Sequence, residues 1–570
     1  EAAVYMQTEN FLRSIIASSF GLQTLDNFIS NILKTLCAEQ EKFKTHSHML
    51  NILMSYNPEI IITPLYKKPQ KKDDQILLGN KGYFLKQLYS LSFPVPPGFV
   101  LTTEIFRCLE AILGYQEIYS DMNMRLEREL KKLEKITHRR FGHPQNPLLL
   151  SVRSGSAISL PGMMSSFLNV GINEEIAEGL SRKKGYAWAA WDCYRRFLQF
   201  WGMSEGLDRD FFDEIIDDFK EKYNVSKKLY FTPDQMREIA LAYRKALEDS
   251  GIAVEDDPPE QLRKAIFKVI ESWHSPRAKL YRQEMNISDK WGTAVVVQSM
   301  VFGNLDEWSG SGVTFTRDPK GLSSSVLLSG DFIFGGQGDD IVAGLVETYP
   351  ISEAQRKSEK RDSEISLENK FPAVYAELKR LAEILIYDQG FGHQEIEFTF
   401  ENNSREGLYI LQTRDMPPPE RFKLKSFIRT PKLEKSLIGY GIGIGGGALC
   451  GRAVFSEEEI KFFSQKEPQT PLILIRPDTV PDDIGLLRQV DGLLTAKGGS
   501  TSHAAVIIPQ LKKVGVVGLR NLKVYEKNGY SLINGYKINS GDFIGIDGWS
   551  GSVYLGKHQI EEKAITPARI

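Results

Sequence analysis

The sequence has few of the features that mark a secreted or membrane protein. Its 570 residues include only four cysteines, which lie far apart at positions 37, 108, 193 and 450. Such isolated cysteines form neither a disulfide framework nor a metal-type pair, so we expect reduced, mostly buried thiols in a cytoplasmic protein. No apolar run approaches the length that crosses a bilayer, and Glu1-Ala2-Ala3-Val4 lacks the basic start and apolar core of a signal peptide.

The sequence also lacks a large excess of positive or negative charge. The 71 basic and 73 acidic residues leave a net charge of −2, which gives no electrostatic reason to expect nucleic acid or an anionic membrane as a partner. Hydrophobic residues at 42% and charged residues at 25% are typical of a globular protein, and the length predicts roughly three or four domains. The initiator methionine is absent, so we expect an excised or processed piece that could have lost a targeting segment.

Periodicity and composition divide the chain into five segments. Apolar residues recur at helical spacing between Phe11 and Leu33, and short β-branched runs alternate with longer helical patterns from Ile76 to Met416. Pro417-Pro418-Pro419 breaks that pattern. We therefore predict a helical extension to about residue 66 with an exposed charged linker behind it (1–75), an α/β or α+β domain (76–416), a hinge linker (417–435), a compact α/β unit (436–557) and a tail (558–570).

Two of these segments show more detail. Glu174 to Asn286 is dominated by charge-laced helical patterns. Five apolar runs of the 436–557 unit predict strands: Ala453–Phe455, Leu472–Ile475, Gly492–Thr495, Gly515–Val517 and Phe543–Ile546.

One histidine stands at a chemically favourable place. Two glycines and three hydroxyl residues, Gly498-Gly499-Ser500-Thr501-Ser502, deliver His503 to the start of an apolar segment. If that segment is a helix, His503 lies in its first turn, where unsatisfied N–H groups and the helix dipole favour negative charge. Such a terminus suits a phosphate, whether bound or carried on the imidazole. The alternative is a capped helix whose histidine only packs.

Two loops carry the features of a phosphate site. Gly79-Asn80-Lys81-Gly82 precedes a helical stretch, and its glycines allow a phosphate close to the backbone while Lys81 offers a cation. Leu150 to Met164 reads as a strand that delivers Arg153 into a loop of small and hydroxyl residues, where the guanidinium can bind phosphate oxygens. The alternatives are an ordinary surface turn and a flexible surface loop.

A polar hairpin completes this set. Gln394–Phe398 and Tyr409–Arg414 read as strands joined by a polar turn. Because side chains two apart share a face, Glu395 and Glu397 project together, and a hairpin would bring Gln412 and Arg414 beside them. Two carboxylates that face a triphosphate require a bridging Mg²⁺. The alternative is an amphipathic hairpin with a surface salt bridge.

These motifs, in this order, resemble those of the phosphohistidine dikinase family, typified by pyruvate phosphate dikinase and phosphoenolpyruvate synthase. Further matches at Phe93–Phe99, Val297–Gly303 and Gly312–Pro319 extend the resemblance over roughly residues 76–555. It implies a multidomain α/β and α+β fold, in which an ATP-grasp domain with helical insertions precedes a swivelling β/α phosphohistidine domain. It also implies that ATP phosphorylates His503, with AMP and phosphate as products, and that the histidine domain carries the phosphoryl group to an acceptor.

The resemblance implies a role for each matching residue. Arg153 and Arg414 would act in catalysis beside the nucleophile His503. The remaining implied roles are Lys81, Arg153 and Arg414 for the ATP phosphates, the segment from Gln298 to Met300 near the adenine, Glu397 and Gln412 for Mg²⁺ with Glu395 beside them, and Thr501 as a regulatory phosphorylation site.

The chain departs from the family pattern in two places. After the histidine it reads Ile507-Ile508-Pro509, where relatives usually carry Ala-Arg-Gly. We therefore expect a shortened or kinked helix and weaker support of the phosphohistidine. Relatives also continue into a barrel that binds pyruvate or phosphoenolpyruvate, whereas this sequence stops soon after Leu555.

The phosphoryl acceptor therefore stays open. It would be pyruvate if the barrel lies on a separate domain or subunit, and a phenol is the alternative. A catalytically inactive nucleotide-binding scaffold and an ATP-grasp ligase that forms ADP are two further hypotheses. The presence of Lys81, Arg153, Glu397 and His503 together argues against the scaffold, and AMP as a product would exclude the ligase.

Overall fold

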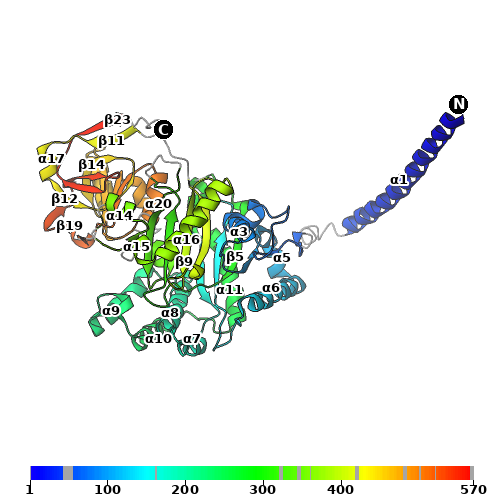
Figure 1. Cartoon of the computed structure of the whole chain (residues 1–570), viewed down its shortest axis with the longest axis horizontal. Coiled ribbons are helices and arrows are strands. Elements are labelled where there is room, and N and C mark those ends of the chain that lie inside the picture. The colour runs from blue at the N-terminus through cyan, green and yellow to red at the C-terminus, as the bar shows by residue number, and fades with distance from the viewer. Residues whose placement is uncertain are drawn as a thin grey trace. The chain divides into compact units, whose positions relative to one another are not determined.

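The computed structural model describes residues 2–42, 55–158, 160, 163–284, 286–319, 325–342, 348–359, 361, 363–416, 423–478, 484–499, 502–519 and 521–564. The chain divides into two compact units, one formed by residues 1–60 and 107–125 and the other by residues 61–106 and 126–570. Figure 1 labels many of their helices and strands.

The first unit is helical. It contains α1 (Ala2–Lys42), α5 (Leu109–Gly114) and the first part of α6 (Gln116–Thr137), so the helical prediction for the beginning of the chain is confirmed. The hydroxyl of Tyr56 donates a hydrogen bond to Asp121 Oδ2 at 2.7 Å, and Arg125 Nε pairs with the same oxygen at 2.8 Å. These contacts tie the segment before residue 60 to α6.

The predicted helical extension ends earlier than expected, because residues 62–64 form a strand. Ile61, Thr63 and Leu65 are buried and alternate with less buried neighbours, which is the period of a strand. Such a short alternation is hidden within a longer apolar helical pattern. The predicted exposed linker is also partly interior, since the Asp73 carboxylate is buried and pairs with the buried Lys86 ammonium at 2.7 Å.

A first antiparallel sheet of the second unit has the strand order β1-β2-β5-β3-β4. Its strands are β1 (Ile62–Pro64), β2 (Gly98–Leu101), β3 (Leu150–Gly155), β4 (Ser166–Val170) and β5 (Ala294–Ser299). The helices in this part of the chain are α3 (Gln75–Ser90), α4 (Thr103–Arg107), α7 (Glu174–Ser181), α8 (Ala187–Ser204), α9 (Arg209–Tyr223), α10 (Pro233–Asp249), α11 (Pro258–Glu271) and α12 (Pro276–Glu284). The helical pattern predicted for residues 174–286 is confirmed.

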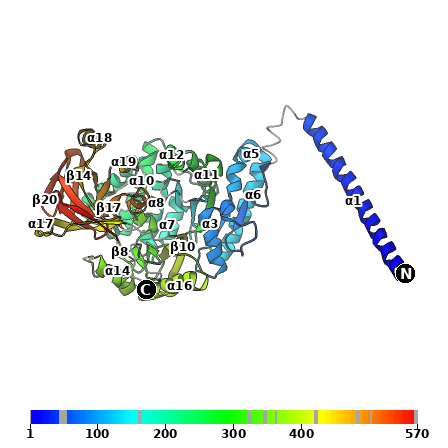
Figure 2. The same cartoon turned by 90° about the horizontal axis from the view of Figure 1, so that it is seen from above.

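A second antiparallel sheet has the order β10-β9-β6-β7-β8. Its strands are β6 (Gly310–Phe315), β7 (Ser329–Phe334), β8 (Tyr349–Pro350), β9 (Gln394–Phe400) and β10 (Leu408–Asp415), and the helices between them are α13 (Gly338–Val342), α14 (Glu353–Ser358), α15 (Leu367–Lys370) and α16 (Pro372–Glu383). α3 and α16 pack on β10 (Figure 2). Leu78, Val296 and Phe398 belong to one buried cluster, so α3 and the two sheets share a core.

The rest of the second unit is built on an eight-stranded sheet of order β12-β22-β21-β14-β15-β16-β17-β13, whose members β14 to β17 run parallel. The five predicted strands are present, as β14, β15, β16, β17 and β21. The strands are β12 (Leu437–Tyr440), β13 (Ile442–Gly445), β14 (Ala448–Val454), β15 (Leu472–Arg476), β16 (Gly492–Thr495), β17 (Val514–Val517), β21 (Phe543–Asp547) and β22 (Ser552–Leu555), with α18 (Glu457–Lys466), α19 (Ile484–Gln489) and α20 (His503–Gln510) between them. A small second sheet holds β18 (Leu522–Tyr525), β19 (Tyr530–Ile533) and β20 (Tyr536–Asn539).

Parts of the predicted hinge and tail are ordered structure. β11 (Lys423–Phe427) pairs antiparallel with β23 (Ile560–Ala564), and α17 (Pro431–Lys435) follows β11. The sequence did not reveal this ribbon because its two strands are separated by more than a hundred residues. Pro417-Pro418-Pro419 lies outside the described residues. In the part of the chain that the structure describes, no helix is both long and apolar enough to cross a membrane.

Candidate active site

The two glycine-containing loops lie against each other. Gly79 has φ 68° and interrupts α3, so the glycine motif breaks a helix instead of preceding one as the sequence predicts. A Cβ at Gly79 would lie 1.5 Å from the carbonyl oxygen of Gly155, and only glycine fits there. The N–H of Asn80 donates to the carbonyl of Ser156 at 2.9 Å. Lys81 therefore stands where the helix restarts, beside the end of β3.

Three cations and a carboxylate meet at this place. The pKa of the half-buried Lys81 ammonium is lowered to about 7, first because the surrounding protein desolvates it and then because Arg153 and Arg414 repel it, while Glu397 acts in the opposite direction. Because Lys81, Arg153 and Arg414 face the two carboxylates of Glu395 and Glu397, the cluster carries surplus positive charge when Lys81 is protonated. An anion placed among these groups would relieve the repulsion, as a polyphosphate would.

Arg153 is fixed at one end and keeps an unused donor. Its Nη2 donates to Gln298 Oε1 at 2.7 Å and to the carbonyl of Leu411 at 3.2 Å, and its Nη1 lies 3.9 Å from Glu397 Oε2. Its Nε is buried and meets no hydrogen-bond acceptor among the described residues. Burial lowers the pKa of the guanidinium and Glu397 opposes this shift. A buried donor without a partner calls for an explanation, and a phosphate oxygen supplies one.

Gln298 orients this arginine. Its amide is buried, its Oε1 accepts from Arg153, and its Nε2 donates to the carbonyl of Pro96 at 2.9 Å. Both ends of the side chain thus act within the protein. Met300, predicted to lie near the adenine, is also buried, and its N–H donates to the carbonyl of Leu149 at 2.8 Å. Their nucleotide contacts stay predictions.

The predicted hairpin brings its two polar pairs side by side. In the register of β9 and β10, Glu397 faces Gln412 and Glu395 faces Arg414. Arg414 Nε donates to Glu395 Oε2 at 2.7 Å, and Nη2 donates to the other carboxylate oxygen. Burial lowers the pKa of Arg414, but pairing with Glu395 outweighs it and raises the pKa. The charge of Arg414 is therefore largely balanced within the hairpin.

Glu397 and Gln412 fit a magnesium ion that is shared with a substrate. A carboxylate and an amide oxygen are ligands of the kind that Mg²⁺ takes, and this ion is commonly held by one or two protein carboxylates together with phosphate oxygens. Across the described residues there is no group of three or more histidine, cysteine, aspartate or glutamate side chains that could hold a metal. The donor set therefore suits Mg²⁺ bound with ATP.

The sheet continues this polar row towards an acid that the sequence did not single out. Asp331 on β7 faces Val313 on β6, which faces Glu397 on β9, so their side chains share one face of the sheet. Strands two places apart are separated by about 10 Å. Asp331 is fully buried, its Oδ1 pairs with Arg361 Nη1 at 2.8 Å, and it accepts from Thr348 Oγ1 at 3.0 Å.

The glycine loop ahead of His503 rests on Asp331. A Cβ at Gly499 would lie 2.6 Å from Asp331 Oδ2 and 3.0 Å from Thr348 Oγ1, so a larger residue would collide. α20 begins at His503 with Ser502 as its N-cap residue, which confirms the prediction that the histidine opens a helix. The Ser502 hydroxyl donates to the carbonyl of Gly499 at 2.9 Å. Thr501, the predicted regulatory residue, lies outside the described residues.

Known proteins match both parts of this arrangement. Residues 116–423 match the family described as pyruvate phosphate dikinase, AMP/ATP-binding domain, and residues 468–551 match PEP-utilising enzyme, mobile domain. Pyruvate, phosphate dikinase of Rhizobium meliloti is 34% identical over 85% of this chain and 56% of its own length. The enzyme of the same name from Clostridium symbiosum is 33% identical over 86% of this chain and 57% of its own length.

The chain belongs to the pyruvate phosphate dikinase family. The resemblance and the multidomain fold class predicted from the sequence are thereby confirmed. The chain spans a little over half the length of these curated dikinases. Arg153, Glu397 and Arg414 lie within the matched AMP/ATP-binding region, His503 lies within the matched mobile-domain region, and Lys81 precedes both.

The departure after the histidine is accommodated at the end of a short helix. α20 has eight residues, and Pro509 falls in its last turn. The N–H of Leu511 donates to the carbonyl of Ile507, and the N–H of Lys513 to that of Ile508. Ile508 is fully buried. The apolar residues after His503 thus anchor α20 to the sheet beneath, and Pro509 lies at the end of the helix, which agrees with the expected shortening.

A buried charge network supports the loop after β7. Arg196 on α8 pairs through Nε with Asp192 at 2.8 Å and through Nη1 with Asp339 on α13 at 2.7 Å, and it also pairs with Asp340. Burial raises the pKa of Asp192, but Arg196, Lys228 and Arg195 hold it well below its ordinary value. The sequence signal for this network is an acid followed by arginines three and four residues later, Asp192, Arg195 and Arg196. The network was not among the sites predicted from the sequence.

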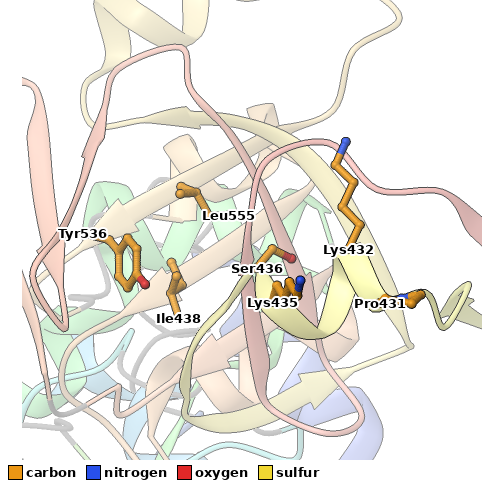
Figure 3. Close-up of a pocket in the computed structure, with 7 residues that line it drawn as sticks. All are labelled: Pro431, Lys432, Lys435, Ser436, Ile438, Tyr536 and Leu555. Carbon is orange, nitrogen blue, oxygen red and sulfur yellow. The ribbon is translucent and has the colours of Figure 1, made fainter.

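A separate hollow lies at the start of β12. It has a volume of about 490 Å³ and is lined by Pro431, Lys432, Lys435, Ser436, Ile438, Tyr536 and Leu555 (Figure 3). It shares no residue with the predicted nucleotide site.

Proposed function

We propose that this chain carries out the first half of a dikinase reaction, in which ATP phosphorylates His503 and AMP is released. One observation carries this proposal. The loop before His503 rests on Asp331, and Asp331 shares a sheet face with Glu397, which stands beside Arg153. The loop before α20 and the cationic cluster thus contact side chains on the same face of the second sheet.

The protein's own groups would act mainly by binding and orientation. The unused Nε of Arg153 would donate to a phosphate oxygen, and the approach of phosphate charge would favour the charged form of Lys81, whose pKa is about 7 without it. Glu397 and Gln412 would hold Mg²⁺, which neutralises charge that develops on the transferring phosphoryl group. The pairing of Glu395 with Arg414 would keep the hairpin in register beside it.

The proposed transfer to His503 releases AMP and phosphate. A bond forms between an imidazole nitrogen of neutral His503 and the β-phosphorus, and the bond from that phosphorus to the oxygen of AMP breaks. The γ-phosphoryl group passes to water and leaves as phosphate. The curated relatives are named for two substrates, pyruvate and phosphate. Phosphate is therefore a second candidate acceptor for the γ-group, and pyrophosphate would then be the product.

We propose pyruvate as the final acceptor, bound by a part that lies on another segment or subunit. The names of the curated relatives support this choice, and the share of their length that this chain covers leaves room for such a part. In that scheme the histidine region carries the phosphoryl group from the cationic cluster to the acceptor. We propose that the moving part is the unit predicted from the sequence, residues 436–557.

Positionally labelled ATP tests the first half-reaction. Wild-type protein with Mg²⁺ is expected to take up label from the β-phosphate and none from the γ-phosphate, and to release AMP. His503→Ala should bind ATP and take up no label. ADP as the product, γ-label that stays on the protein even when phosphate is added, or equal labelling of His503→Ala would contradict the proposal. A parallel reaction with added phosphate, read for pyrophosphate, decides between water and phosphate.

A further inference from the structure

Helix α1 exposes a row of large apolar side chains. They include Val4, Phe28, Ile29, Ile32, Leu33 and Leu36, which are between 43% and 67% exposed. Helices of globular proteins normally bury such residues against a neighbour, and contiguous exposed apolar surface marks an interaction site. The chemistry described above uses none of these residues.

The apolar residues of α1 follow a heptad pattern. From residue 4 to residue 36 the spacing alternates strictly between four and three, and eight of the ten positions are apolar: Val4, Phe11, Ile15, Leu22, Leu25, Ile29, Ile32 and Leu36. Thr8 and Ser18 occupy the other two. A hydrophobic repeat of 3.5 residues that is sustained over more than four heptads is the pattern of helices that supercoil around each other. We call these ten positions the seam.

We propose that α1 is a self-association element, which forms a coiled coil with α1 of a second copy of this chain. The seam contains no charged residue, so pairing with an identical helix places no like charges together. The ten positions that flank it contain a single charge, Asp26. Since flanking charges are what select a different partner helix, their scarcity favours an identical partner.

The length of the seam is sufficient for a stable interface. Thirty-three residues from Val4 to Leu36 span about 50 Å of helix. With four of every seven positions at the contact, each copy contributes about 19 residues, close to the roughly 20 to 30 per side of stable protein interfaces. The apolar flanking residues Leu12, Phe28 and Leu33 widen the contact further.

The test is the mass of the whole chain in solution, measured by light scattering across a concentration series. Wild-type protein is expected to have at least twice the 64.5 kDa mass of one chain. Ile29→Asp with Ile32→Asp should convert it to the monomer, because two charges per chain enter the seam. The matched control, Asn27→Asp with Asn31→Asp, adds the same charge on the other face of α1 and should leave the oligomer intact. Far-UV circular dichroism and the thermal melt should be the same for all three proteins, which shows that they are folded.

Three results would overturn the proposal. Wild-type protein that stays monomeric at tens of micromolar does so, and so does an oligomer that survives both seam substitutions. The third is a monomer that sediments with phosphatidylcholine–phosphatidylglycerol vesicles through the same residues, since α1 would then face a lipid surface. None of these results depends on the labelling of His503, so this proposal and the proposed function fail separately.

Discussion

The two sheets that meet at the candidate site supply their arginines in opposite electrostatic states. Arg153, from the first sheet, is held by a neutral amide and a carbonyl, lies 3.9 Å from the Glu397 carboxylate without a hydrogen bond to it, and keeps a buried Nε without a partner among the described residues. Arg414, from the second, is paired through two donors with Glu395. The difference separates two tasks: one arginine keeps its charge for a ligand, and the other fixes the hairpin that carries Glu397 and Gln412.

The largest effect is expected from removing the uncommitted charge. Arg153→Met should reduce label transfer to His503 by at least about 100-fold, as the loss of a charge-stabilising donor in an active site typically does. Arg414→Met should reduce it less and should also lower thermal stability, because Glu395 would be left without its partner. Single-turnover labelling and thermal melts measure the two effects. The contrast between the two arginines is wrong if Arg414→Met slows label transfer more than Arg153→Met does and leaves thermal stability unchanged.

A substitution at Gln298 can give Arg153 a charged partner like the one that Arg414 has. Gln298→Glu places a carboxylate against Arg153, which should then be neutralised as Arg414 is by Glu395, and KM for ATP should rise about tenfold with a smaller change in kcat. Gln298→Leu removes the acceptor without adding charge and should raise KM by less. Steady-state AMP formation measures both. Equal KM values in Gln298→Glu and wild type would show that the amide does not govern Arg153.

The pH dependence of ATP binding tests the protonation of Lys81, the third cation of the cluster. The ordinary lysine pKa is lowered in Lys81 to about 7, so the ammonium is present below pH 7 and is lost above it. Because phosphate favours the charged form, binding should take up about one proton at pH 8 and almost none at pH 6, and affinity should fall about tenfold between those values. Calorimetry in buffers of different ionisation enthalpy measures the uptake. Lys81→Arg should abolish it, and proton uptake that persists in this variant would assign it to another group.

The smallest effect is expected for residues outside the candidate site. Lys435→Ala and Tyr536→Ala, in the hollow at the start of β12, should leave labelling unchanged and stability within about 0.5 kcal/mol. A loss of labelling in either variant would give that hollow a role in the transfer.

The difference between the regions also explains what the sequence could reveal. The pairing of Glu395 and Glu397 with Gln412 and Arg414 was predictable, because two alternating polar patterns lie close together along the chain around a turn. Asp331 was not, since a single acid within an apolar strand has no spacing partner. Its contacts come from residues as distant as Gly499.

Short or distant pairings were missed for a related reason. β1 has three residues, too few for its period to be separated from the helical pattern before it. The β11–β23 ribbon joins the two ends of the histidine region, and nothing local records that partnership. Local periodicity thus predicted the strands and α20, while tertiary contact alone determined which acid receives the glycine loop.

The most direct test of the account is a single methyl group at Gly499. Gly499→Ala would drive a Cβ into Asp331 Oδ2, whereas the matched Gly446→Ala points into open space. We expect Gly499→Ala to bind ATP as wild type does but to transfer label to His503 at least about tenfold more slowly, and Gly446→Ala to transfer it normally. Wild-type transfer by Gly499→Ala would contradict the claim that this loop must rest on Asp331 for the phosphoryl group to reach the histidine.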